Sequence, residues 1–219
     1  MGRDILVVTH TQARHHVEGL VGGWYDSELT SLGHRQAQRL ASRIGQLAGD
    51  GRPVELYASD LLRTAQTAAP IAARLGVPAT YLVDLREQSA GVAGGRPNAW
   101  LQAREIPPLR AADRMDHRNG VEGAETRREL FTRIYRAMDQ ILEGPCATQV
   151  VVTHGIALTA VVAAWIRMPL ESASWVNFRA GPGGLTHLSQ DDHHFDRAVL
   201  CLNDRSHLDG VDDSAAQAR

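Results

Sequence analysis

The segment Val150-Val151-Val152-Thr153-His154-Gly155 decides the fold, together with a near-copy at the start of the chain, Leu6-Val7-Val8-Thr9-His10-Thr11. Each segment is a short, β-branched apolar run, which is typical of a strand buried on both faces of a sheet. A lone histidine at a strand end is more often structural than catalytic. Because ligands bind at the carboxyl ends of strands in open parallel α/β sheets, we expect His10 and His154 to share one site.

The composition is that of an ordinary globular domain. The chain of 219 residues, with 43% hydrophobic and 22% charged residues, is long enough for one domain with a full core. The formal net charge of -2 predicts no binding to nucleic acid or to an anionic membrane. Cys146 and Cys201 are too few for a disulfide framework and lack metal-ligand spacing. Without a signal-peptide pattern or a bilayer-spanning apolar run, we expect a cytoplasmic protein.

Strands and helices alternate along most of the chain. Short apolar runs predict strands at 5–8, 54–58, 79–83, 149–153, 175–179, 185–189 and 197–202. Helical periodicity predicts four main helices. The first begins at about Ser31 with Thr30 or Ser31 as its N-cap, and the second follows an N-cap at Ser59 or Asp60. The third begins at Glu125, and the fourth covers 156–166. The pattern predicts an α/β fold, a three-layer α/β/α sandwich with a mostly parallel mixed sheet.

One domain is expected over residues 1–208. The Gly- and Pro-rich segment at about 88–123 holds only a short predicted helix at 98–104, and it is interpreted as an insertion or lid over the site. Trp100 and His117 are its candidate substrate contacts, although a solvated surface loop is an equal alternative for each. The polar tail at 209–219 is expected to be disordered.

Two charged residues follow strands that should end at the edge occupied by the histidines. Arg63 lies at a strand-to-helix junction, where free backbone N–H groups already suit an anion. The segment Asp84-Leu85-Arg86-Glu87 ends the next strand and places a carboxylate at the same edge. The sequence therefore predicts one site that combines two histidines, an arginine and a carboxylate.

The chain resembles the histidine phosphatase superfamily, the phosphoglycerate-mutase-like phosphatases, from about Ile5 to Ser206. The motifs that carry this resemblance are Thr9-His10-Thr11, Gly23-Trp24-Tyr25-Asp26-Ser27-Glu28-Leu29-Thr30-Ser31-Leu32-Gly33-His34-Arg35-Gln36-Ala37, Ser59 to Thr67, Leu85-Arg86-Glu87, Gly123-Ala124-Glu125-Thr126, and Val152-Thr153-His154-Gly155. Several spaced motifs in the right order are far more specific than one short pattern.

The resemblance implies a phosphatase that acts on a small phosphorylated metabolite. His10 would be the nucleophile that forms a phosphohistidine, and Arg63 and His154 would hold the phosphoryl oxygens. Glu87 would be the proton donor, with a pKa raised by burial. The chemistry needs neither a metal ion nor a cofactor.

Three positions depart from the family pattern. The arginine of the family's Arg-His-Gly is Thr9, the family's loop asparagine falls at His16, and a further loop arginine falls at Leu20. Arg14 and the neighbouring histidines are candidates to restore positive charge to the pocket. Thr9, Arg14, His16 and Gly155 are therefore counted, with Trp100 and His117, as candidate substrate-binding residues.

Alternatives stay open at this level. The same residues could serve acid-base chemistry on another substrate, or the chain could be a binding domain with a degraded site. A phosphoglycerate mutase is less favoured, because nothing in the chain indicates that a phosphoryl group is retained and transferred again. The identity of the substrate and the choice between a monomer and a homodimer are not decided by the sequence.

Overall fold

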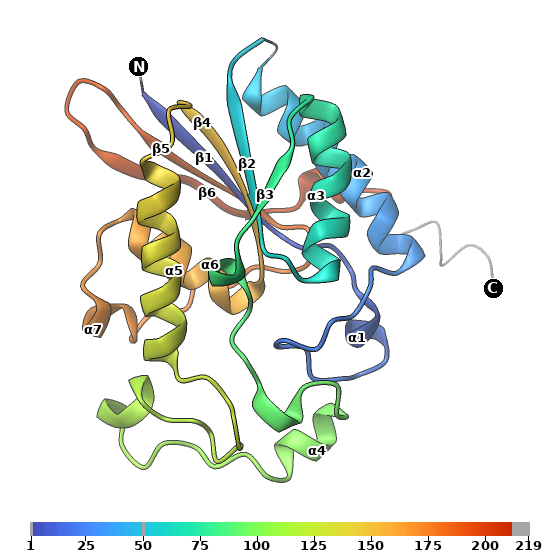
Figure 1. The fold of residues 1–219 in the computed structure, drawn as a ribbon, viewed down its shortest axis with the longest axis vertical. Helices are drawn as coiled ribbons and strands as arrows, with labels where there is room; N and C mark the ends of the chain where they lie inside the picture. The colour runs from blue at the N-terminus through green and yellow to red at the C-terminus, as the bar shows by residue number, and fades with distance from the viewer. Residues whose placement is uncertain (1, 50, 212–219) are drawn as a thin grey trace.

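A single mixed sheet organises the chain. The structure is a computed structural model, and it describes residues 2–49 and 51–211. Its six-stranded sheet has the order β3-β2-β4-β1-β5-β6 (Figure 1). The strands are β1 Arg3–Thr9, β2 Val54–Ala58, β3 Ala79–Tyr81, β4 Thr148–Thr153, β5 Leu185–Gln190 and β6 Arg197–Asp204. The helices are α1 Arg14–Val17, α2 Ser31–Ala48, α3 Leu62–Leu75, α4 Asn98–Gln102, α5 Arg127–Leu142, α6 Gly155–Trp165 and α7 Leu170–Ala173.

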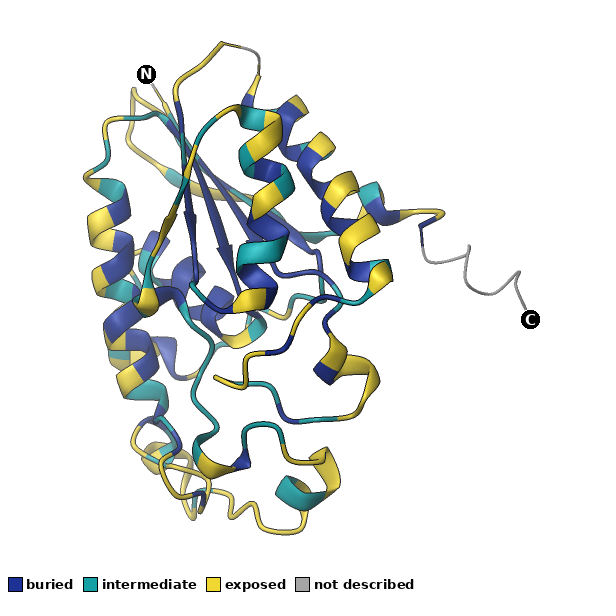
Figure 2. Ribbon diagram, turned by 45° about the vertical axis from the view of Figure 1, so that its right-hand side comes forward, coloured by how far each residue is buried: buried dark blue, intermediate teal, exposed yellow. Residues whose placement is uncertain are grey.

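Helices cover both faces of the sheet, as predicted. Successive residues of β1 point to opposite faces, because side chains alternate along a strand. Ile5 and Val7 belong to a core with residues of α5 and α6. Leu6 and Val8 belong to a second core with residues of α2 and α3. Figure 2 shows the buried central strands between helices whose outer faces are exposed, so the fold is a three-layer α/β/α sandwich.

The two histidine-bearing segments lie side by side. β1 and β4 pair in parallel, with Thr9 opposite Thr153. The ladder continues one step further, since the His10 backbone N–H donates to the Thr153 carbonyl at 2.9 Å. Backbone pairing therefore sets the positions of His10 and His154, and it confirms that the two strand ends meet.

The helix caps were only partly predicted. The Thr30 side chain accepts from the Gly33 backbone N–H and caps α2, as expected. The N-cap residue of α3 is Leu61, and not Ser59 or Asp60. The first loop, residues 10–30 between β1 and α2, supplies a carboxylate in place of the missing cap, because Asp26 accepts from the Leu62 backbone N–H at 2.6 Å.

Two strand predictions need correction. The third strand ends at Tyr81 and is followed by a 3-10 turn at Val83–Leu85. Residues 175–179 form no strand, because their backbone is bonded by side chains of the helical layer: Phe178 N–H donates to Thr159 Oγ1 and the Val176 carbonyl accepts from Arg127. Side-chain partners thus replaced the strand ladder that the β-branched and aromatic composition favoured.

The segment 88–123 lies across the carboxyl ends of the strands (Figure 1). Apart from α4 it contains the 3-10 turns Gly91–Ala93 and Ala111–Met115. Backbone bonds tie it to the first loop, because Val21 N–H donates to the Arg96 carbonyl and Asn98 N–H to the Gly19 carbonyl, each at 2.8 Å. Most of the tail expected to be disordered, from residue 212 on, lies outside the described residues. No described helix is both long and apolar enough to cross a membrane.

Candidate active site

A cavity of about 380 Å³ opens at the carboxyl ends of β1, β2 and β4. His10, Arg63 and Glu87, predicted to be catalytic, all line this cavity. The predicted binding residues Thr9, His16 and Gly155 line it as well. His154 is fully buried beside His10, with their ring centroids 5.2 Å apart. The structure thus brings together the four residues proposed for catalysis.

His10 is held in one tautomer by two hydrogen bonds. Its Nδ1 lies 2.9 Å from the Thr11 carbonyl oxygen, which can only accept, so Nδ1 carries the proton. Its Nε2 then bears a lone pair and accepts from Arg63 Nε at 3.3 Å. Burial, and next the charge of Arg63, hold the pKa of His10 well below its usual value. His10 is therefore a neutral imidazole whose unprotonated nitrogen lies next to a cation.

Backbone carbonyls of the first loop hold the Arg63 guanidinium in place. Its two terminal nitrogens donate to the Tyr25 carbonyl at 2.8 Å and the Gly23 carbonyl at 2.6 Å. Burial lowers its pKa to about 10, which leaves the group charged at neutral pH. Because a guanidinium has five N–H donors, two remain after these bonds and the bond to His10. Arg63 is thus a fixed hydrogen-bond donor for an anion beside the His10 ring.

His154 supports the site from within the core. Its Nε2 shares a hydrogen bond with Ser59 Oγ at 3.0 Å, while its Nδ1 has no partner among the described residues. Burial, and then the Arg63 charge, hold the pKa of His154 well below its usual value. His154 is therefore neutral, with one buried ring nitrogen unpaired, and unlike the other three predicted catalytic residues it is not among the described residues that line the cavity.

Glu87 lies at the amino terminus of α6. Its Oε1 accepts from Gln88 N–H and Ala157 N–H, and its Oε2 accepts from Ile156 N–H at 3.0 Å. Burial raises the pKa of Glu87, as expected, while these backbone bonds and the Arg63 charge oppose the rise. Glu87 thus combines a raised proton affinity with a fixed orientation at the cavity wall.

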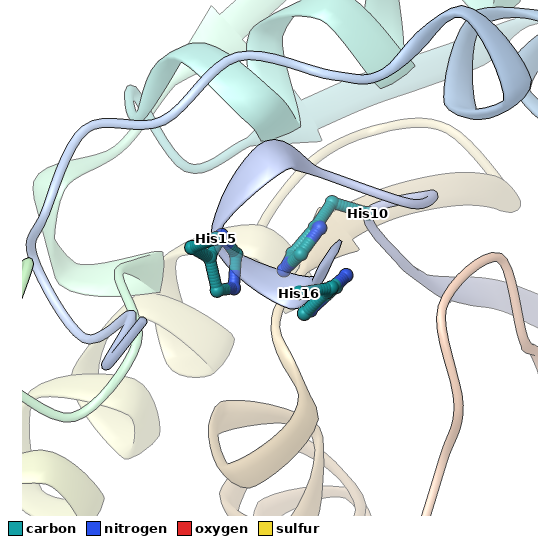
Figure 3. A group of neighbouring side chains, drawn as sticks. All are labelled: His10, His15 and His16. Atoms are coloured by element: carbon teal, nitrogen blue, oxygen red, sulfur yellow. The ribbon is translucent and has the colours of Figure 1, made fainter. Parts of the chain in front are cut away.

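A cluster of three histidines, His10, His15 and His16, faces the cavity (Figure 3). One ring nitrogen of each lies within 4.8 Å of those of the others, a spacing at which metal ligands can meet. In His16, however, Nδ1 accepts from the Ala13 backbone N–H at 3.2 Å, so its Nε2 carries the proton of the neutral ring. The Nε2 of His10 already accepts from Arg63. His10 and His16 are therefore arranged for hydrogen bonding, and not for binding a metal ion.

Thr9 has a second role besides lining the cavity. Its hydroxyl donates to the Gly181 carbonyl at 2.6 Å and accepts from Gly184 N–H at 3.1 Å. The side chain, 2% exposed, thereby ties the end of β1 to the glycine turn that precedes β5. An arginine at this position would lose both bonds, so Thr9 is part of the scaffold here.

Three predicted binding residues lie away from the cavity. Arg14 is exposed and pairs with Glu28 at 2.7 Å. The Trp100 ring packs beneath Arg104 and against the apolar cluster of the lid, and His117 contacts the Ile106 carbonyl. None of Arg14, Trp100 and His117 is among the described residues that line the cavity.

Sequence reasoning missed Arg133, a buried residue of α5. Its guanidinium pairs with Glu125 through two contacts of 2.7 Å and donates to the carbonyls of Asp84, Arg86 and Glu87. Arg133 therefore fixes the segment that carries Glu87. The only signal was an arginine on the otherwise apolar face of a predicted helix. Trp24 assists, because its Nε1 donates to the Glu87 carbonyl at 2.7 Å.

Comparisons with known proteins identify the family of this chain. The family model of the histidine phosphatase superfamily (branch 1) matches residues 5–204. "Probable phosphoglycerate mutase GpmB" of Yersinia pestis is 29% identical over 217 residues, covering 90% of this chain and 97% of that protein. A solved mycobacterial glucosyl-3-phosphoglycerate phosphatase is 25% identical with a TM-score of 0.74, covering 93% of this chain and 99% of that one. The α-ribazole phosphatase of Shigella flexneri, 23% identical, shares the fold with a TM-score of 0.74, over 92% of this chain and 96% of its own.

The family match spans both histidine-bearing strands and the segments that carry Arg63 and Glu87. Both solved structures share the overall fold of this chain. The chain belongs to the histidine phosphatase superfamily.

Proposed function

We propose that this protein is a phosphatase that hydrolyses a small phosphomonoester metabolite through a phosphohistidine at His10. The observation that carries the proposal is the pairing of His10 with Arg63. The unprotonated Nε2 of His10 and the guanidinium of Arg63 lie together at the cavity wall, 3.3 Å apart. A nucleophile with a lone pair beside a fixed cation suits attack on an anionic phosphoryl group.

The reaction has two displacements. His10 Nε2 attacks phosphorus, so that a P–N bond forms while the bond from phosphorus to the leaving oxygen breaks, and Glu87 gives its proton to that oxygen. Water then attacks phosphorus, the P–N bond breaks, and Glu87 takes up a proton from the water. Arg63 and His154 hold the phosphoryl oxygens during both steps, where the charge of the transition state is spread. The products are the free alcohol and inorganic phosphate.

The choice of hydrolysis over mutase chemistry rests on the cavity, because the relatives carry names of both kinds. The Yersinia relative is named a probable phosphoglycerate mutase. The solved mycobacterial relative is described as a glucosyl-3-phosphoglycerate phosphatase. A mutase must keep its product bound for return of the phosphoryl group. The cavity lining offers Arg63 as its only arginine or lysine among the described residues, and that cation is needed by the phosphoryl group. No metal ion or cofactor is needed for either step.

The first prediction is that phosphate can be trapped on His10. Brief incubation with a ³²P-labelled aryl phosphate, followed by quenching in base, should leave acid-labile label on the protein, because phosphohistidine is stable in base and hydrolyses in acid. The His10→Ala variant should carry no label. His34→Ala, which alters an exposed histidine of α2, is the matched control and should be labelled like the wild type. Equal labelling of His10→Ala would refute the proposal.

A further inference from the structure

Beyond the phosphoryl site, the charges of the cavity wall are unevenly distributed. Arg63 is the only arginine or lysine among the described residues that line the cavity. The other charged groups are two carboxylates, Glu87 and Glu125. The negative charge of Glu125 is already balanced, since both of its oxygens pair with the Arg133 guanidinium. The cavity therefore holds one cation for an incoming anion, and no second one.

Part of the cavity wall is apolar. Val21, Val121 and Ala124 form a small core cluster, and Ala90 and Leu101 pack against it. All five of these side chains also line the cavity. Burial of an apolar group against such a wall is favourable, whereas burial of an ionised group there without a partner is costly.

Four further polar side chains of the cavity wall are uncharged. Asn98 and Asn119 reach the cavity from the lid, and Gln88 and Ser89 follow the Glu87 segment. The Gln88 side chain donates to the Glu125 carbonyl at 2.7 Å, and Ser89 Oγ accepts from Gly91 N–H at 3.2 Å. Neutral amides suit hydroxyl groups or ring nitrogens, which they can bind without a charged partner.

We infer that the substrate is the phosphate ester of an uncharged, largely apolar alcohol, and not a phosphorylated carboxylic acid. The inference rests on the proposed phosphatase function and names the substrate class of the same cavity. A phosphorylated acid would bring a second negative charge into a cavity whose lining offers Arg63 as its only arginine or lysine among the described residues, and Arg63 is taken by the phosphoryl group. Burial of an ionised carboxylate against an apolar wall without a partner is costly. The site therefore selects by the charge of the leaving group.

The test compares phenyl phosphate with 4-carboxyphenyl phosphate. The carboxylate changes the reactivity of the leaving phenol little, so the pair isolates the effect of its charge. We expect kcat/KM for phenyl phosphate to exceed that for the carboxylated ester by roughly tenfold or more. Hydrolysis of both esters with equal kcat/KM, or a preference for the carboxylated ester, would overturn the inference while leaving the phosphatase function intact. Failure to hydrolyse either ester would overturn the proposed function, and the inference with it.

A positive charge introduced at residue 98 of the cavity wall gives a second test of the charge preference. Asn98 is exposed at the start of α4, so a longer side chain there has room. Asn98→Arg should bring the ratio of the two kcat/KM values several-fold closer to one, because it supplies the missing cation. Asn98→Gln is the matched neutral control and should keep the wild-type ratio. An equal change of the ratio in both variants would mean that shape, and not charge, sets the preference.

Discussion

Hydrogen bonding and burial act in opposite directions on the pKa of Glu87. Three backbone N–H groups donate to its carboxylate, which favours the ionised form, yet burial raises its pKa. A phosphoryl group bound at His10, as proposed, would add a further negative charge close by and would shift the balance toward the protonated form. The same bonds that oppose protonation also fix the carboxyl group, so that a proton carried by Glu87 is held at a defined place.

Replacement of Glu87 by glutamine should separate its two roles. Glu87→Gln cannot give a proton, so esters with poor leaving groups should lose about 10²–10⁴-fold in kcat/KM, whereas activated aryl esters should lose much less. The measurement is kcat/KM for a series of esters of increasing leaving-group pKa. Equal losses across the series would show that Glu87 is not the proton donor. Phosphohistidine formation from an activated ester serves as the control for an intact His10.

The hydrogen bonds of the histidine cluster predict that activity does not depend on a metal ion. His16 carries its proton on Nε2 and His10 Nε2 accepts from Arg63, so a metal ion would have to break both arrangements. Dialysis against a chelator should leave kcat/KM for phenyl phosphate unchanged. The check is metal content measured beside activity. Loss of activity on chelation, restored by Zn²⁺, would identify the cluster as a metal site.

At the scale of elements, Arg133 joins α5 to the segment that carries Glu87. It is nine-tenths buried, and its removal would leave the carboxylate of Glu125 without its cation. Arg133→Met should therefore lower the free energy of unfolding by about 3–5 kcal/mol, as is typical when one partner of a buried pair is removed. Urea unfolding measures the loss.

The double variant Arg133→Met with Glu125→Gln is the control for this prediction. Because it also removes the uncompensated carboxylate, it should recover part of the lost stability. A double variant that is less stable than Arg133→Met, by the full cost of a separate Glu125→Gln change, would mean that the two side chains do not interact.

The central elements could be predicted because their signals are local. β2 was predicted with its exact bounds, and β1 and β4 to within two residues, because buried parallel strands are short continuous apolar runs. The cap of α3 could not be predicted, since Asp26 lies 36 residues before the N–H that it binds. The support of Glu87 by Arg133 is likewise a long-range contact. Local patterns thus located the reacting groups, while the groups that hold them come from distant parts of the chain.

At the scale of the whole molecule, the buried histidines couple stability to pH. His10 and His154 are kept neutral with lowered pKa values, and burial lowers the pKa of His15 to about 3. In the unfolded chain each would take up a proton below about pH 6.5. The unfolded state then binds more protons than the native state, so stability is fully present above that pH and falls as the pH is lowered.

Each of these histidines should contribute a slope of up to about 1.4 kcal/mol per pH unit below pH 6.5. Urea unfolding at pH 7.5, 6.5, 5.5 and 5.0 measures the combined slope. His15→Gln should reduce it, whereas His34→Gln, at an exposed position of α2, should retain the wild-type slope. A stability that stays constant between pH 7.5 and 5.0 would contradict the prediction.

The attachment of residues 88–123 has a consequence for the engineering of this protein. The residues proposed for catalysis follow the strand ends, while several other side chains of the cavity wall come from a segment tied to the first loop mainly by backbone bonds. Backbone bonds do not depend on side-chain identity. The segment is also joined to α5 by side chains, because Asp116 pairs with Arg128 and Arg118 with Glu129. A transplanted segment should therefore need these two α5 partners to move with it, whereas its junction with the first loop should accept many different side chains.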